Sequence, residues 1–311
     1  MNDVTIELTK QEFTGGDTVA GEVIVRLGQD TPLRGIRLRL NGYEESRWSE
    51  GSGKHRHTHS ETRTLFDQEV TLQGRPRLSP GQLVVDGLRA VFSKDNYELL
   101  PAGTYRYPFS YVLPPDLPGD YTSALTKSEI YYGIKAQVDL PLKFDLKAKQ
   151  SLVVRESTGL ETAQAVTQRQ TKKFLFDSDS LVEAAVHMDK DTFYLGEVLH
   201  CQLEVMNRAP RKEIRAATLA LRQLETAYAD GRTHERQTEI TRTRFDQCRF
   251  PVKERKTVDL TLGVPGNLFP TIARARLLKL DYELQVTLDI PWAVDAKLSV
   301  PVKLLRAPAQ G

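Results

Sequence analysis

Three closely spaced histidines are the strongest candidates for chemistry in this 311-residue chain. His55, His57 and His59 alternate with other residues, so an extended segment would project all three imidazoles from one face. Imidazole nitrogens bind zinc, and histidines with an ordinary pKa gain positive charge as the pH falls through about 6.5. The segment could therefore hold a metal ion or sense pH, and ordinary solvated side chains are the third interpretation.

The usual ligand set of a metal site is incomplete at these histidines, because no cysteine or close-packed carboxylate accompanies them. We therefore expect no bound metal and no cofactor. The sequence also lacks Gly-x-Ser-x-Gly, His-Glu-x-x-His and a phosphate-binding loop. We predict that the protein is not an enzyme, and a metal-dependent hydrolase built around the histidines is the alternative.

The histidines belong to a polar stretch, residues 48–64, with Gly51 and Gly53 near its centre. Glycines between polar residues predict the turn of a hairpin. Such loops often carry binding residues, but a solvated hairpin without a partner is an equally open interpretation. For the tryptophans at positions 48 and 292, packing at a strand end is the favoured alternative to ligand binding. The partner-contact candidates in this stretch are Trp48, Lys54, His55, Arg56, His57 and His59.

Lys10 is a further partner-contact candidate, at what we expect to be the first strand. An exposed edge strand can pair with an extended peptide, and a lysine there would attract acidic or phosphorylated side chains. The alternative is that an edge lysine only prevents aggregation, which is the commoner role.

The composition is that of an ordinary soluble globular protein, with 40% hydrophobic and 27% charged residues. A net charge of +2 provides no strong field for nucleic acid or a membrane surface. Only Cys201 and Cys248 are present, which favours a reducing compartment over a disulfide framework. The chain has no apolar run long enough to span a membrane and no secretory leader, so we expect a cytoplasmic protein without transmembrane insertion.

Apolar residues recur with a period of two along most of the chain. This alternation predicts strands with one face in a core and the other in water, as in antiparallel sheets packed as a sandwich. Arg37 and Arg39 should then face solvent. One short helix is expected within residues 85–100. The clearest alternating sets are Ile36, Leu38, Leu40; Val258, Leu260, Leu262, Val264; Tyr282, Leu284, Val286, Leu288, Ile290; and Leu298, Val300, Val302, Leu304.

An internal repeat divides the sequence. The heptapeptide TRTLFDQ at 62–68 returns as TRTRFDQ at 241–247, and Gly16 and Gly196 follow matching phenylalanines. A duplicated domain repeats its landmarks in order, so we interpret the heptapeptide as the same strand in two related sandwiches. The expected organisation is a first domain at 1–156, a polar linker at 157–173, a second domain at 174–306 and a short tail at 307–311.

Several blocks in this order resemble the arrestin family, and its alpha-arrestin branch more than its visual branch. In the first copy these are FTGGDTVAGEVIVRL, IRLRLNGYEESRW, GTYRYPFSYVLPPDLPGDY and IYYGIKAQVDLP. In the second copy MDKDTFYLGEVLHCQLEVMN is similar to the opening of the family's C-terminal domain. The resemblance covers residues 3–305, nearly the whole chain.

The resemblance implies an all-β protein of two tandem immunoglobulin-like, arrestin-type β-sandwich domains joined by a hinge. It also implies a non-catalytic cytosolic adaptor or scaffold in trafficking or signalling. Such a protein binds protein partners, including cytoplasmic segments of membrane proteins, through loops and edge strands. Residues 48–64 correspond to the family's finger loop, which contacts partners. A trafficking-coat subunit resembling the arrestin-like component of retromer is the alternative.

Overall fold

The computed structural model describes residues 2–74, 97–141, 143–156, 166–174, 177–208, 213–291 and 295–307. The chain divides into two compact units, Met1–Ser157 and Thr158–Gly311. The described residues form strands and one 3₁₀-helix, with no α-helix among them. The two tandem β-domains predicted from the sequence are therefore confirmed.

The first unit contains twelve of the strands and the 3₁₀-helix η1 (Gly53–His55). Its strands are β1 (Asp3–Leu8), β2 (Glu12–Thr14), β3 (Thr18–Leu27), β4 (Thr31–Leu33), β5 (Gly35–Glu50), β6 (His57–Gly74), β7 (Glu98–Leu100), β8 (Gly103–Val112), β9 (Tyr121–Thr122), β10 (Glu129–Asp139), β11 (Leu146–Ser151) and β12 (Val153–Arg155).

The second unit contains the remaining nine strands. They are β13 (Val166–Phe174), β14 (Asp177–Met188), β15 (Thr192–Tyr194), β16 (Val198–Asn207), β17 (Ala216–Ala229), β18 (Arg232–Phe245), β19 (Glu254–Gly263), β20 (Leu278–Asp289) and β21 (Ala296–Leu305).

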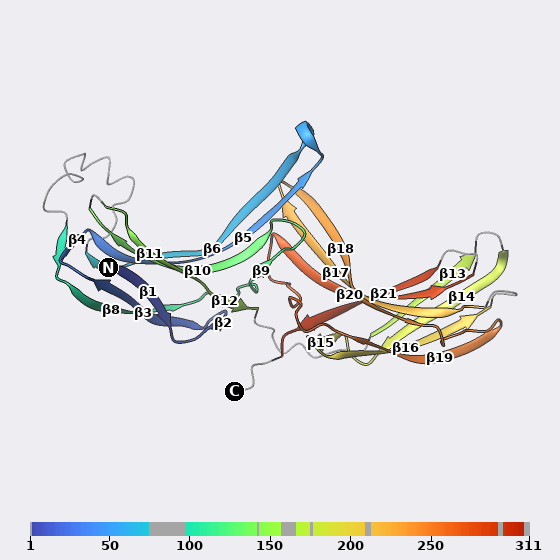
Figure 1. Cartoon of the computed structure of the whole chain (residues 1–311). Helices are drawn as coiled ribbons and strands as arrows, with labels where there is room; N and C mark the ends of the chain where they lie inside the picture. The colour runs from blue at the N-terminus through green and yellow to red at the C-terminus, as the bar shows by residue number, and fades with distance from the viewer. Residues whose placement is uncertain are drawn as a thin grey trace. The chain divides into compact units, whose positions relative to one another are not determined.

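Each unit is a sandwich of two sheets (Figure 1). In the first unit a three-stranded sheet, β1-β3-β8, packs against a larger sheet with the order β11-β10-β5-β6, to which β9 is added beside β10. In the second unit the order is β13-β14-β16-β19 in one sheet and β15-β21-β20-β17-β18 in the other. Antiparallel neighbours in these sheets explain why the sequence alternates between apolar and polar residues.

The alternating residues of the sequence form the two cores. Ile36, Leu38 and Leu40 of β5 are each at most 1% exposed, and the inward residues of β20 and β21 are buried in the same way. Arg37 departs from the expected pattern, because only 6% of it is exposed. Its guanidinium forms an ion pair of 2.9 Å with Asp139, so the prediction that it faces open solvent was wrong.

In each unit a buried tyrosine of the larger sheet binds the connecting segment that precedes it, at equivalent positions. The Tyr132 hydroxyl donates to the carbonyl of Pro118 at 2.7 Å, and the Tyr282 hydroxyl donates to the carbonyl of Phe269 at the same distance. Burial raises the pKa of both hydroxyls, so both remain protonated donors. The two tyrosines are 150 residues apart, as the sequence repeat requires.

The repeated heptapeptide does lie in the same strand of each unit, but at different positions along it. Ile36 pairs with Gln73 in the first unit, whereas its equivalent Ala217 pairs with Phe245 in the second. Phe245 therefore occupies the place of Gln73 and not that of Phe66. Because the first hairpin is longer, its heptapeptide lies further from the base, so the two copies share a strand but not a register.

Two other sequence expectations meet the structure only in part. Residues 166–173, which we assigned to the linker, belong to β13, and this strand pairs with β14 of the second unit. The short helix expected within residues 85–100 falls largely on positions 85–96, outside the described residues.

The buried tyrosine hydroxyls generate a prediction about stability. Tyr132→Phe and Tyr282→Phe remove a hydroxyl but keep the ring, leaving a carbonyl without its donor. Each should lower the free energy of unfolding by about 1–2 kcal/mol, measured by urea denaturation. The control is Tyr194→Phe, since Tyr194 is 45% exposed. A loss no larger than the control's would show that the hydroxyl bonds to the connecting segments do not stabilise the units.

Candidate functional site

The β5–β6 hairpin carries most of the partner-contact candidates. Its strands pair from Gly35 opposite Gly74 to Glu50 opposite His57, and η1 closes the tip. Gly51 has a φ of 79°, and a Cβ there would lie 2.4 Å from the His55 carbonyl oxygen. Only glycine fits this turn without strain. The hairpin projects beyond the sandwich of its own unit (Figure 1).

The arms of the hairpin are held together just below the tip by Trp48. This side chain is 4% exposed, and its ring lies 5.2 Å from the ring of His59, the residue directly opposite. The Trp48 Nε1 donates to Glu50 Oε1 at 3.2 Å, and Glu50 Oε2 lies 3.9 Å from His59 Nε2. Trp48 and His59 thus form a packed cross-strand pair.

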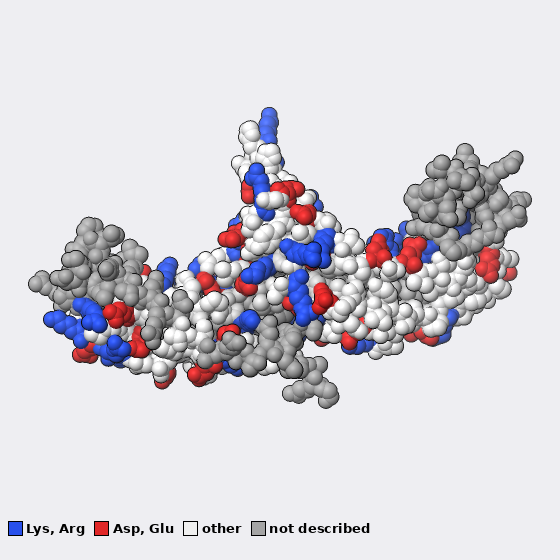
Figure 2. Space-filling model, turned by 180° about the vertical axis from the view of Figure 1, so that it is seen from behind, with Lys and Arg blue, Asp and Glu red and all other residues white. Residues whose placement is uncertain are grey.

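The remaining candidates of this hairpin are exposed at its tip. Lys54 and His55 lie in η1, Arg56 follows it, and His57 begins β6. Arg56 reaches back to the Ser49 hydroxyl at 3.4 Å. Figure 2 shows Lys and Arg side chains at the end of the projection, with acidic side chains only further along its arms. The tip is therefore a small cationic surface at the end of a paired two-stranded stem.

The three histidines do not form the single row that a fully extended segment would give. His57 and His59 share a face of β6, but His55 lies in the 3₁₀ turn. Among the described residues, no three or more His, Cys, Asp or Glu side chains are placed to hold a metal ion. The packing of His59 against Trp48 gives that histidine a structural contact instead.

Lys10 lies beyond the first strand and not within it, which corrects the sequence expectation. β1 ends at Leu8, and the Lys10 Nζ forms an ion pair of 2.6 Å with Asp17, 5.6 Å from the centre of the Phe13 ring. Asp17 also accepts a hydrogen bond of 2.7 Å from the Thr14 amide. The lysine and aspartate thereby close the turn that contains β2.

The second unit repeats this turn. Lys190 pairs with Glu197 and lies 4.9 Å from the centre of the Phe193 ring. Glu197 accepts the amide hydrogen of Tyr194 at 2.8 Å, as Asp17 accepts that of Thr14. The same lysine–carboxylate pair closes the equivalent turn in both units. This structural role accounts for Lys10 without a binding partner protein.

Hydrogen bonds hold both of these carboxylates in the charged form. The bond from Lys10 and that from the Thr14 amide lower the pKa of Asp17. Burial by itself would raise the pKa of Glu197, but the bonds from Lys190 and the Tyr194 amide outweigh it and lower that pKa. Each carboxylate is therefore more acidic in the folded protein than in the unfolded chain.

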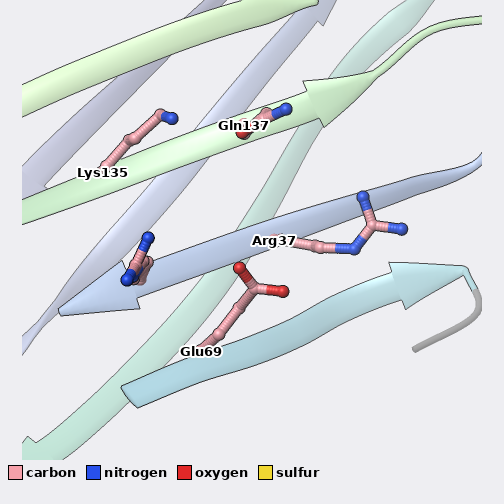
Figure 3. Close-up of a pocket in the computed structure, with 5 residues that line it drawn as sticks. Arg37, Glu69, Lys135 and Gln137 are labelled. Atoms are coloured by element: carbon pink, nitrogen blue, oxygen red, sulfur yellow. The ribbon is translucent and has the colours of Figure 1, made fainter. Parts of the chain in front are cut away.

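The outward face of the larger sheet in the first unit carries a charged pocket that the sequence analysis missed. A small cavity of about 30 Å³ is lined by Arg37, Arg39, Glu69, Lys135 and Gln137. Figure 3 shows Glu69 reaching from β6 toward β5, while Lys135 and Gln137 stand on β10 across from Arg37. Asp67 holds Arg39 through two bonds of 2.6 and 2.5 Å. Of its charged residues, the sequence analysis had placed only Arg37 and Arg39 on the outward side of a strand.

Comparison with known proteins gives a consistent result over both units. The model of "Arrestin (or S-antigen), N-terminal domain" matches residues 3–160, and that of the C-terminal domain matches residues 178–309. Within the part of the chain that is described, no helix is long and apolar enough to cross a membrane.

Three curated relatives illustrate the range of similarity. Arrestin domain-containing protein A of Dictyostelium discoideum is 24% identical over 97% of this chain and 51% of its own length. Arrestin domain-containing protein 17 of Caenorhabditis elegans is 24% identical over 91% of this chain and 66% of its own length. Arrestin domain-containing protein 4 of Mus musculus is 23% identical over 96% of this chain and 70% of its own length. The chain thus spans about half to two thirds of these relatives.

The Lys10–Asp17 pair generates a pH-dependent prediction. Asp17→Asn should lower the free energy of unfolding by about 1 kcal/mol at pH 7, a modest amount because the pair is largely exposed. The pKa of Asp17 is lower in the folded protein than in the unfolded chain, where it is about 3.9. The charge of Asp17 therefore stabilises the fold fully when the pH is above the unfolded-state pKa, and this stabilisation is lost as the pH falls through the folded-state pKa.

Urea denaturation of wild type and variant at pH 7 and at about pH 3 measures this effect. The difference between them should shrink at the lower pH, because this pH lies below the unfolded-state pKa of Asp17, so the unfolded chain takes up a proton that the folded protein binds less readily. Glu235→Gln, an exposed carboxylate of β18, is the control and should leave stability unchanged at both values. A pH-independent difference for Asp17→Asn would contradict the assigned role of its charge.

Proposed function

The chain belongs to the arrestin family, and on that basis we propose that it is a non-catalytic adaptor that binds protein partners. The family is one of adaptors and scaffolds in trafficking and signalling. The proposed place of action is the cytoplasm, where the partners include cytoplasmic segments of membrane proteins. The two free cysteines agree with a reducing compartment.

The tip of the β5–β6 hairpin is the proposed contact surface. The observation that carries this proposal is the separation of two roles along one hairpin. Trp48 and His59 pack inside the stem, whereas Lys54, His55 and Arg56 are exposed at the end and bury nothing in their own unit. Exposed tip residues on a rigid stem can contact a partner without any change in the core.

The chemistry of the tip favours an acidic partner segment. Lys54 and Arg56 carry positive charge at the tip, and the His55 imidazole between them can donate a hydrogen bond. Opposite charges at such a rim mainly raise the association rate and select the partner. Lys10 is a weaker candidate, because the equivalent Lys190 closes the corresponding turn of the second unit.

The test shortens the hairpin without changing its register. Glu50 pairs with His57, so replacing residues 51–56 by Asn-Gly leaves a two-residue turn between paired positions. The free energy of unfolding should change by about 1 kcal/mol or less, since the tip is exposed. Recovery of partners by affinity purification should fall about tenfold, as expected for the loss of main contact residues.

A charge-matched control removes two cations from the other unit. Arg232 and Arg242 are exposed on β18, and the double variant Arg232→Gln, Arg242→Gln should recover partners at the wild-type level. The reversal Lys54→Glu, Arg56→Glu should weaken recovery at least as much as the shortened tip does. Normal recovery by a shortened, fully folded variant would remove the hairpin tip as the contact surface.

A further inference from the structure

The larger sheet of the first unit presents three cations in one cross-strand row. Lys149 of β11 lies directly opposite Lys135 of β10, and Lys135 lies directly opposite Arg39 of β5. Cβ atoms in such pairs are about 4.5–5.5 Å apart, and like charges directly opposite each other destabilise a sheet.

The acidic residues of this face lie at one end of the row. Glu69 of β6 is directly opposite Arg39, and Asp67, also of β6, makes a two-bond contact with the Arg39 guanidinium. That contact raises the pKa of Arg39 and fixes its side chain toward β6. The positive charge on the β10–β11 side of the row is therefore provided mainly by the two lysines.

A pocket of about 260 Å³ opens over the lysine side of the row. The charged residues that line it are Arg39, Lys135 and Lys149, and no acidic residue is among its described lining. Asn41 and Tyr131 also line it and add an amide and a hydroxyl that can donate hydrogen bonds. The adjoining smaller cavity differs in this respect, because Glu69 lines it.

The side chain of Tyr131 lies over Gly133 beside this pocket. A Cβ on Gly133 would lie 2.5 Å from the Tyr131 hydroxyl, so the glycine leaves space for the ring in this position. The Tyr131 ring also packs against Tyr43, with the ring centres 5.4 Å apart. The pocket therefore combines positive charge with a neutral donor.

We propose that this pocket binds the phosphate group of a small soluble phosphate monoester. A dianion interacts with both lysines at once, whereas a single carboxylate has one charge to share between them. The volume suits a small molecule. The lining residues come from three neighbouring strands of one sheet, β5, β10 and β11, so the geometry favours a free ligand held on this face, with a lipid headgroup as the alternative that the test separates.

Isothermal titration with glycerol 3-phosphate at low ionic strength tests the proposal, with glycerol as the uncharged comparison. We expect saturable one-to-one binding with a Kd below about 1 mM. Affinity should rise between pH 5 and 7, because a phosphate monoester gains its second negative charge with a pKa of about 6. Amide resonances of Gly133 and Lys149 should shift in the same titration.

Matched variants locate the site. Lys135→Gln and Lys149→Gln should each weaken binding about tenfold, and Tyr131→Phe by a smaller factor. Lys147→Gln is the control, because Lys147 is an exposed lysine of the same strand that does not line the pocket. It should retain the wild-type affinity within about twofold.

Three results would overturn the proposal. One is an absence of saturable binding by the folded wild type. Another is equal weakening by Lys147→Gln and Lys149→Gln, which would mean unspecific screening of β11. The third is binding to phosphatidylcholine vesicles containing a phosphoinositide, with none to glycerol 3-phosphate, which would assign the surface to a membrane.

Discussion

The pairing of β5 with β10 on one side and β6 on the other is the interaction on which the first unit depends. A slip of one residue would turn every side chain of β5 to the opposite face. Gly42 fixes the register from within, because a Cβ there would lie 2.6 Å from Tyr132 and 2.8 Å from Phe66. The buried face of β5, its charged outward face and the position of the hairpin tip all follow from that register.

Some features occur in both units and others in only one, and the shared ones serve the fold. The lysine–carboxylate turn, the parallel β2–β12 and β15–β21 pairs, and the buried tyrosines occur in both units. These features satisfy backbone groups and close turns that any such sandwich must contain. The hairpin tip differs between the units, because residues 51–56 separate the last paired positions in the first unit, whereas the second unit has a two-residue turn at Asp230 and Gly231.

Charge on the first unit is arranged locally and not as an overall field. The net charge of the whole chain is only +2. The first unit nevertheless has a cationic hairpin tip, an Arg39–Asp67 ion pair at β6, and a pocket lined by three cations. Such separation would let the proposed protein contact at the hairpin and the proposed anion site on the sheet act independently. Screening reduces the influence of exposed charges on each other beyond about 8 Å at physiological salt.

The sequence by itself determined the β class, the two related halves and most of the core, because burial of one sheet face imposes a period of two that can be read directly. It could not place Arg37, since an alternating arginine looks solvent-exposed until Asp139 is brought beside it. It also could not set the register of the repeated heptapeptide, because identity between segments does not fix strand register. Only the tertiary structure decided which charges meet: Lys149, Lys135 and Arg39 are distant in sequence, and sheet pairing alone makes them neighbours.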